Sequence, residues 1–495
     1  MKKEAPARYE RVERSQFVLE PVDVERLIDE NHAARNIWNL LGRLDLSKFR
    51  GEVKAVEGHA GRNTWEPQVL IAIWLYAYSR GLSSARQIER ECGYEPGLRW
   101  LLGLKTVNHH TLSDFRAEQG AALQDLFKQV LGLLMMERLI TLERVTVDGT
   151  KVRAAANKKT FSRKEKIAEH LKVAEKHLAE LQREETEQEK RGRQAAAQRR
   201  AARERVSRLE NALKEVERLQ KEKKWERDKP CQASSSDADA QFMRLSDHGL
   251  APAYNVQFVT DAQNKLIVDV EVSKQPSDSQ HLTPALERIQ TAQGRYPQQV
   301  IADGDYTNRE SVCAAAACGI DYYGSWRLDK KEQKMAHGIA AGFEPQAFAY
   351  DRSTNQMTCP AGKSLRLVGI QNKKGGLHTH VYAARREDCQ SCSQRIFCTP
   401  NNKMSKHGRV VSRRVEPTAV ADYHAKMNTA EAKAIYKQRA PVAEFPHAWM
   451  KDKLQWFRVR GRGQIKVKAE ALWVALTYNL QRYFKLSTSF KPAVA

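Results

Sequence analysis

Long apolar runs are missing from this chain, and their absence first excludes membrane-spanning proteins. No stretch of its 495 residues approaches the roughly 20 consecutive apolar residues of a membrane-spanning helix. The N-terminus carries lysines at positions 2 and 3 and lacks the apolar segment of a signal peptide. We therefore expect the protein to stay in the cytoplasm of the cell that makes it.

Cysteine is also scarce: the chain has 8, too few for a disulfide scaffold at this length. Cys389 and Cys392 have the two-residue spacing of a zinc knuckle. Tetrahedral zinc needs four ligands, so the sequence predicts a candidate structural zinc site at Cys359, Cys389, Cys392 and Cys398, with His378 or His380 in reserve. Ordinary thiols are the alternative for these four and the expectation for Cys92, Cys231, Cys313 and Cys318.

Acidic residues are outnumbered, since 60 aspartates and glutamates stand against 83 lysines and arginines, for a formal net charge of +23. The natural partner of such an imbalance is a polyanion. Nucleic acid is the first expectation, and an anionic membrane surface is the alternative. The length is several times that of one domain, so we expect more than one core and at least one insertion.

The first 140 residues predict an all-α module, because residues 21–140 carry capped stretches with periodic apolar positions. Residues 81–90 and 111–116 each place a Ser or Thr cap before a segment with arginines, as a helix-turn-helix reader of DNA would. An ordinary capped helix bundle is the alternative interpretation.

Residues 163–220 are rich in Lys, Arg, Glu, Gln and Ala and contain two apolar stripes with helical spacing. The stripes are Ile167, Leu171, Ala174, Leu178 and Leu181, and then Val206, Leu209, Leu213 and Val216. With Gly192 between them, they predict an antiparallel coiled-coil hairpin. Such an arm would track DNA, dimerise or simply project into solvent. A linker rich in Ser, Asp and Ala follows at 231–240.

Two aspartates follow apolar, strand-like runs far apart in the chain. The segment 143–151 delivers Asp148 at its end, and the segment 300–306 does the same for Asp303. Strands are expected at 253–260, 265–273 and 320–323, and helices at 279–293 and 308–318. Apart from the arm, this order is β-β-β-α-β-α-β, which matches the ribonuclease H-like fold. In that mixed sheet the first three strands are antiparallel and metal ligands collect at strand ends.

A third acid lies in a helical pattern near the C-terminus. Glu444 and Lys451 stand seven residues apart, two helical turns along one face. Pro441 and Pro446 bracket the glutamate, and since proline fits best in a first turn, we expect Glu444 near the helix start.

Three carboxylates without histidine or thiolate suit hard divalent cations such as Mg²⁺ or Mn²⁺. A pair of such ions about 4 Å apart promotes phosphodiester cleavage by binding both the attacking and the leaving oxygen. The sequence therefore predicts two-metal chemistry on a phosphodiester.

The chain resembles bacterial insertion-sequence transposases of the DDE type over nearly its whole length. The resemblance is carried by the segments around Asp148 and Asp303, by the glutamate helix and by the segment after it. Its residues are Asp148, Gly149, Thr150, Lys151, Tyr254, Asn255, Asp303, Tyr306, Tyr436, Arg439, Glu444, Lys451, Arg462, Gly463, Glu470, Tyr478, Asn479, Leu480 and Arg482. No single motif is specific, but their order and context are.

This resemblance implies that Asp148, Asp303 and Glu444 are the catalytic, Mg²⁺-binding triad. It also implies DNA contacts from residues on and after the glutamate's helix: Tyr436, Arg439, Lys451 and Arg462. The chain departs from the family pattern at Ala443, where valine is frequent, and at Asp305, where glycine is usual. Asp305 lies two residues from Asp303 and would point to the same side of a continuing strand, so it is a rival ligand to Asp303. Glu470 is an alternative third acid, although we expect a structural role for it, paired with an arginine.

Together these patterns predict a mixed α+β or α/β protein in five parts. They are a helical DNA-binding or dimerisation module (1–140), a ribonuclease H-like core (141–160 and 250–345), a coiled-coil hairpin (161–235), a cysteine-bearing insertion (346–425) and a C-terminal helical part of the core (426–495).

The resemblance implies a nucleoid-associated transposase that cleaves the terminal inverted repeats of its element and joins them to target DNA, at least as a dimer on DNA. A catalytically inactive or domesticated DNA-binding protein, and a nuclease that cuts without joining, are the alternatives.

Overall fold

The computed structural model describes residues 14–15, 17, 19, 21–50, 64–186, 193–222, 231–246, 248–326, 339–351, 353–373, 377–399, 406–415 and 417–487. The chain divides into two compact units. The first comprises residues 1–129, 453–456 and 472–495, and the second comprises residues 130–452 and 457–471. Gly192, expected between the two stripes of the arm, lies outside the described residues.

The first unit is helical. Its elements are η1 (Val24–Leu27), α1 (Ala33–Leu41), η2 (Ser47–Phe49), α2 (Pro67–Ser79), α3 (Ala85–Glu91), α4 (Pro96–Leu102), α5 (His109–Glu118), the start of α6 (Gly120–Met136) and the later part of α17 (Gln464–Leu486). Nine consecutive residues of α2, from 70 to 78, are buried, so this helix forms the centre of the unit.

The helix pair proposed to read DNA differs from the sequence prediction in two respects. The helix α5 begins at His109 and is capped by Asn108, so Thr111 lies inside it and is not a cap. The Arg116 guanidinium stacks 4.6 Å from the Trp74 ring and donates to the Ser83 carbonyl at 2.8 Å. Arg116 therefore serves the packing of this unit, whereas Arg86 and Arg90 of α3 are exposed.

The second unit is built on a six-stranded mixed sheet. Its strands are β1 (Arg144–Arg153), β4 (Gln241–Arg244), β5 (Leu250–Asp261), β6 (Ile267–Ser273), β7 (Gln299–Ala302) and β8 (Asp321–Gly324). Along the sheet the order is β4-β5-β1-β7-β8, and β6 also pairs with β5. Strands β1, β5 and β6 are mutually antiparallel, while β7 and β8 run parallel to β1. The predicted mixed sheet is confirmed, and its arrangement is compatible with a ribonuclease H-like core.

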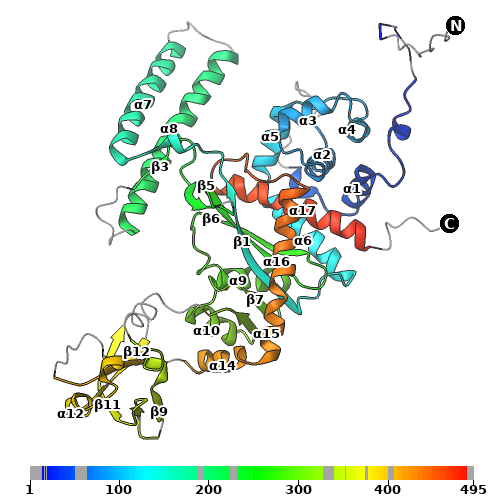
Figure 1. Ribbon diagram of the computed structural model, residues 1–495. Coiled ribbons are helices and arrows are strands. Elements are labelled where there is room, and N and C mark those ends of the chain that lie inside the picture. The colour runs from blue at the N-terminus through cyan, green and yellow to red at the C-terminus, as the bar shows by residue number, and fades with distance from the viewer. Residues whose placement is uncertain are drawn as a thin grey trace, which may run out of the picture. The chain divides into compact units, whose positions relative to one another are not determined.

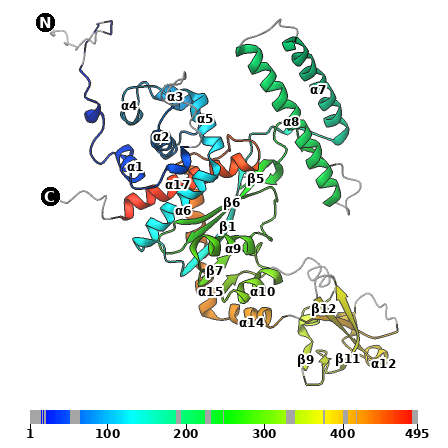
Figure 2. The ribbon, with the colours of Figure 1, turned by 180° about the vertical axis from the view of Figure 1, so that it is seen from behind.

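Helices cover this sheet from several parts of the chain. Helix α9 (Leu282–Gln293) packs on β6 and α10 (Arg309–Ala317) packs on β8, and the two helices lie beside each other (Figures 1 and 2). Helix α16 (Arg439–Asp452) lies along β1 and also touches β5 (Figure 1). It is preceded by α14 (Thr418–Met427) and α15 (Ala430–Lys437).

Helices α7 (Lys164–Thr186) and α8 (Arg193–Glu222) follow β1 and pack against each other. Their contact uses the two predicted stripes, with Ile167, Ala174, Leu209 and Val216 buried in one cluster. At the base, η3 (Lys158–Thr160) leads into β2 (Phe161–Ser162), which pairs with β3 (Ala233–Ser234).

The segment 231–240 is more than a linker. Asp237 is buried, and its Oδ1 accepts hydrogen bonds from the Tyr254 hydroxyl at 2.6 Å and from the Gly463 amide at 3.0 Å. Its polar composition suggested a solvated connection, but these residues instead pair with groups from distant parts of the chain.

The cysteine-bearing segment forms a small antiparallel sheet of five strands in the order β13-β12-β11-β10-β9. Its elements are η4 (Pro345–Ala347), β9 (Ala349–Asp351), β10 (Gln356–Thr358), β11 (Ser364–Lys373), β12 (Leu377–Ala384), α12 (Arg386–Gln390), α13 (Arg395–Cys398) and β13 (Val410–Arg414). Among the residues described for this sheet, the core is a small cluster around Leu365 and Tyr382.

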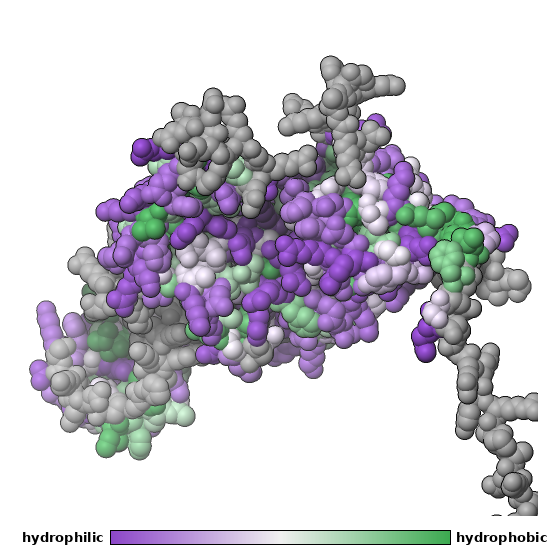
Figure 3. Space-filling view, turned by 90° about the horizontal axis from the view of Figure 1, so that it is seen from above, coloured by the Kyte–Doolittle hydropathy of each residue, from purple (hydrophilic) through white to green (hydrophobic). Residues whose placement is uncertain are grey.

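Hydrophilic side chains dominate the face shown in Figure 3, with smaller hydrophobic patches between them. Among the described helices, none combines the length and the apolar character that crossing a membrane would require.

Candidate active site

The first two predicted acids lie at neighbouring positions on two parallel strands. The pairing of β1 with β7 runs from Arg144 opposite Gln299 to Val147 opposite Ala302, where β7 ends. The next residue on each chain is Asp148 on β1 and Asp303 after β7. Because paired residues of parallel strands share a face, the register brings these carboxylates together.

Asp148 does not end its strand, so the sequence prediction was wrong on this point. Strand β1 continues to Arg153 because β5 pairs with it in unbroken antiparallel register beyond the Asp-Gly dipeptide. Asp148 is thus a mid-strand residue. It pairs with β5 on one side of β1, but on the other side the pairing with β7 ends one residue earlier, at Val147.

Asp303 opens a turn immediately after β7. Its Oδ1 accepts a hydrogen bond from the Asp305 amide at 2.6 Å, and its carbonyl accepts one from the Tyr306 amide at 3.1 Å. Asp305 was expected on a continuing strand, but it lies on this turn and is exposed. The expectation that it shares a strand face with Asp303 was therefore wrong.

The electrostatic environment of Asp148 is unusual. Burial raises the pKa of this carboxyl from 3.8 to about 6, and the nearby carboxylates of Asp303 and Asp278 act in the same direction. The Arg439 guanidinium opposes the rise in pKa, as does the Gly149 amide, which donates to Asp148 Oδ1 at 2.9 Å. Burial and the neighbouring carboxylates disfavour the ionised form of Asp148, so a cation bound nearby would stabilise that form.

Helix α16 presents two side chains to Asp148. Arg439 Nη1 lies 3.6 Å and His447 Nδ1 lies 3.8 Å from Asp148 Oδ2. Burial lowers the pKa of His447 to about 3, and the charges of Lys451 and Arg439 add to the effect, so this imidazole is neutral at physiological pH. Its ring also packs 5.6 Å from the Phe258 ring, between centroids.

Glu444 lies inside α16, not at its start. The helix begins at Arg439 and runs through Pro446, so the prediction of a helix start near Glu444 was wrong. Burial of Val442, Ala443 and Met450 holds the helix despite the missing proline N–H. Glu444 is exposed and lies one turn before His447.

Among the described residues, no group of three or more His, Cys, Asp or Glu side chains is already arranged to hold a metal ion. The structure thus brings Asp148 and Asp303 together and places Glu444 on the helix that packs on β1, without closing a three-acid site.

Glu470, the alternative third acid, is buried at 1% exposure. Its carboxylate accepts hydrogen bonds from the Arg460 amide at 2.8 and 3.1 Å and from the Gly461 amide at 3.0 Å. Two backbone amides thus hold this carboxylate at the turn before α17.

The residues expected to contact DNA are spread over several elements. Tyr436 lies on α15, a helix separate from that of Glu444, and packs in a cluster with Ile301 and Tyr323. Lys451 lies in the last turn of α16, and Arg462 is exposed beyond it.

One acid of this region was missed in the sequence. Asp278, before α9, accepts hydrogen bonds from Lys151 Nζ at 2.9 and 3.1 Å, from Asn255 Nδ2 at 2.6 Å and from Gln257 Nε2 at 2.7 Å. Gln257 in turn accepts from the Tyr306 hydroxyl. The network ties the Asp148 strand to the Asp303 turn. No local pattern signals it, since Asp278 resembles a helix cap and its partners come from other strands.

Two family models match this chain. A transposase DDE domain matches residues 358–484, which include strands β11 to β13 of the cysteine-bearing sheet and Glu444, and a transposase domain matches residues 22–118 in the helical unit. A comparison with curated proteins finds no match. The matched domains define a transposase. Together they support an insertion-sequence transposase of the DDE type.

Proposed function

We propose that this transposase binds the terminal inverted repeats of its insertion sequence and catalyses Mg²⁺-dependent cleavage and strand transfer through Asp148, Asp303 and Glu444. The observation that carries the proposal is the adjacency of Asp148 and Asp303 where β7 leaves the sheet. Two acids from distant parts of the sequence meet there beside α16, which brings Arg439 within 3.6 Å of Asp148.

The residues present fit divalent cations. The three proposed ligands are carboxylates, and hard cations such as Mg²⁺ or Mn²⁺ prefer oxygen donors. Asp148 is held in an environment that raises its pKa to about 6, so a nearby cation would favour its charged form. When bound, two such ions would activate the attacking oxygen and stabilise the departing one.

The chain's own residues have distinct proposed tasks. In this proposal Asp148 and Asp303 hold the cations together with Glu444, which is carried by α16, the helix that packs on β1. Arg439, 3.6 Å from Asp148, offsets its charge and turns to a DNA phosphate when substrate binds. Lys451, Arg462 and the Tyr436 hydroxyl give further phosphate contacts, which position DNA without reading its sequence.

The proposed DNA affinity is salt-dependent, because phosphate contacts release counterions. The stretch from Lys451 to Lys468 is rich in lysine and arginine, but its cations do not contribute equally, since Lys468 Nζ lies 2.9 Å from Glu271 Oε2. We place the action of the protein at the nucleoid in the cytoplasm, as a homodimer or larger assembly on DNA, because two element ends must be paired.

The alternative is an inactive or domesticated DNA-binding protein with the same fold. Two observations support this alternative. Glu444 is exposed, and among the described residues no three acids are already arranged to hold a metal ion.

The test is cleavage of a duplex that carries the element's own end, in Mg²⁺, by the native chain and by Asp148→Ala, Asp303→Ala and Glu444→Ala. Asp305→Ala is the matched control, because Asp305 is an exposed acid on the Asp303 turn. We expect the control to cut and all three triad variants to bind DNA without cutting. Strand-transfer products in a plasmid assay separate a transposase from a simple nuclease.

Cutting by Glu444→Ala would refute its role as third ligand. Binding without cutting by the native chain would favour the DNA-binding alternative.

A further inference from the structure

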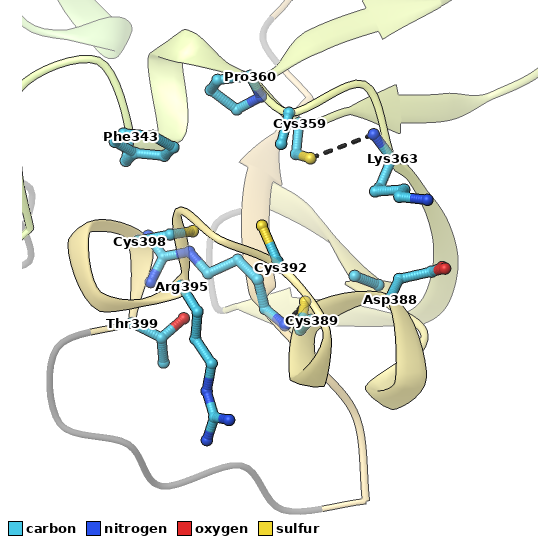
Figure 4. Close-up of a pocket in the computed structure, with 13 residues that line it drawn as sticks. Phe343, Cys359, Pro360, Lys363, Asp388, Cys389, Cys392, Arg395, Cys398 and Thr399 are labelled. Atoms are coloured by element: carbon cyan, nitrogen blue, oxygen red, sulfur yellow. Dashed lines mark hydrogen bonds between the residues drawn. The ribbon is translucent and has the colours of Figure 1, made fainter.

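Four cysteines from three segments of the cysteine-bearing sheet surround one pocket (Figure 4). Cys359 lies on the turn between β10 and β11, Cys389 in α12, Cys392 just after α12, and Cys398 at the end of α13. All are free thiols. The reserve ligands considered from the sequence do not line this pocket, and His380 Nδ1 instead lies 3.4 Å from the Tyr382 hydroxyl.

The backbone around Cys359 has the form of a tight loop that presents its sulfur. The Cys359 amide donates to the Lys363 carbonyl at 2.8 Å, and the Gly362 amide donates to the Cys359 carbonyl at 2.8 Å. The loop closes because Gly362 adopts a φ of +76°, which favours glycine. The Lys363 amide then donates to Cys359 Sγ at 3.3 Å, the contact dashed in Figure 4.

A second sulfur receives the same kind of contact from a different loop. The Arg409 amide donates to Cys389 Sγ at 3.2 Å. A Cβ at Gly408 would lie only 2.6 Å from this sulfur, so a glycine is needed for the loop to approach it. Two of the four sulfurs thus already accept hydrogen bonds from backbone amides that point at them.

The charge around the pocket fits a metal–thiolate group. A Zn²⁺ ion with four thiolates carries a net charge of −2, and the pocket is lined by three cations, Lys363, Arg395 and Arg409, against one acid, Asp388. A small apolar core is a second reason for a metal, because domains with little core commonly need one for stability. Here the buried core consists of Phe348, Met357, Leu365, Tyr382, Ala384 and Val411.

We propose that Cys359, Cys389, Cys392 and Cys398 bind one structural Zn²⁺ ion that holds this sheet together. The thiols lose their protons to solvent as four Zn–S bonds form, with no oxidation or reduction. In the described parts of the chain no three such side chains already converge on one point, so in this proposal the sulfurs move closer together when the ion binds. This site is separate from the proposed catalytic acids and does not depend on them.

The first experiment measures zinc in the full-length protein, purified without added metal, by inductively coupled plasma mass spectrometry. We expect about one zinc per chain, and Co²⁺ exchanged into the site should give an intense sulfur-to-cobalt charge-transfer band. Cys389→Ser with Cys392→Ser should lose both signals. Cys313→Ser with Cys318→Ser is the matched control and should keep both, because these thiols lie at α10, away from the pocket.

A second measurement on the native chain avoids reliance on variants that fail to fold. Titration with an organomercurial should release zinc in step with modification of four thiols, and this result would support the proposal. A native chain that takes up no zinc when reduced and supplied with it would overturn the proposal. A Cys389→Ser, Cys392→Ser protein that retains stoichiometric zinc would overturn it equally.

Discussion

Arg439 of α16 and Asp148 of β1 are held 3.6 Å apart, from guanidinium Nη1 to carboxylate Oδ2, with about one fifth of each side chain exposed. Burial raises the pKa of this carboxyl to about 6, whereas the charge of the guanidinium lowers it. Arg439 only partly offsets that burial, so the ionised Asp148 reduces the stability of the metal-free protein.

Replacing Asp148 with Asn should therefore stabilise the metal-free protein at neutral pH. Because the folded-state pKa lies above 3.8, protonated Asp148 favours the folded state below about pH 4, and this contribution disappears as the pH rises through about 6. The asparagine keeps the neutral form throughout, so its advantage should grow over that window to about 2–3 kcal/mol. Urea unfolding between pH 4 and 8 measures the difference.

The control for this substitution is Asp305→Asn, at an exposed acid, which should change stability by no more than about 0.5 kcal/mol. If Asp148→Asn is no more stable than the native chain at pH 8, the buried charge is compensated in some other way. Added Mg²⁺ should narrow the gap by stabilising only the native chain.

Removing the Asp278 carboxylate should destabilise the protein strongly. Asp278→Ala leaves Lys151, whose side chain is 16% exposed, without its partner, and breaking a buried pair costs about 3–5 kcal/mol. Lys151→Met in the same protein should recover much of this loss. Urea unfolding of the two single variants and the double variant gives the coupling energy.

A surface ion pair provides the comparison for Asp278. Lys164 and Glu217 lie 2.9 Å apart with side chains 43% and 45% exposed, so Glu217→Ala should cost less than about 1 kcal/mol. Equal losses from Asp278→Ala and Glu217→Ala would show that the network does not brace β1.

Gly149→Ala should lower stability and cleavage together. A Cβ at Gly149 would lie 2.4 Å from Gln257 Nε2 and 2.9 Å from Asn255 Oδ1, so β1 or the network must shift, at about 1–3 kcal/mol. Gly132→Ala on α6 is the control, because its Cβ would meet nothing within 4 Å. The control should gain about 0.5–1 kcal/mol from helix propensity. Thermal unfolding and the cleavage rate are the measurements.

Glu470→Ala and Glu444→Ala should have opposite phenotypes. Without the Glu470 carboxylate the amides of Arg460 and Gly461 lose their acceptor, which should cost about 2 kcal/mol or more. Glu444 is exposed, so its removal should leave stability within about 0.5 kcal/mol while cleavage is lost. A stable but inactive Glu470→Ala protein would reverse the assignment of the third acid.

The order of elements was predictable because the strands and helices of the core have clear local periodicity. The alternating apolar residues of β6 and the apolar run of β7 before Asp303 are the residues that the sheet buries. The two apolar stripes at 167–181 and 206–216 are the residues through which α7 packs on α8. These features depend on neighbours in sequence, so they are visible without a structure.

The remaining features depend on distant neighbours. Asp148 followed by Gly149 resembles a turn, and only pairing with β5 keeps the strand extended there. Pro446 resembles a helix start, yet burial of the surrounding side chains carries α16 through it. The Asp278 network joins three separate segments, so no local pattern could have revealed it.

The short ladder of β2 with β3 also bears on the order of folding. It joins Phe161 to Ser234 and Ser162 to Ala233, at the two ends of the long excursion through α7 and α8. Loop-closure entropy grows with the length of free chain between two partners. If α7, α8 and the β2–β3 pair fold first, the length of unfolded chain between β1 and β5 becomes much shorter. The large insertion should then slow the pairing of these two strands very little.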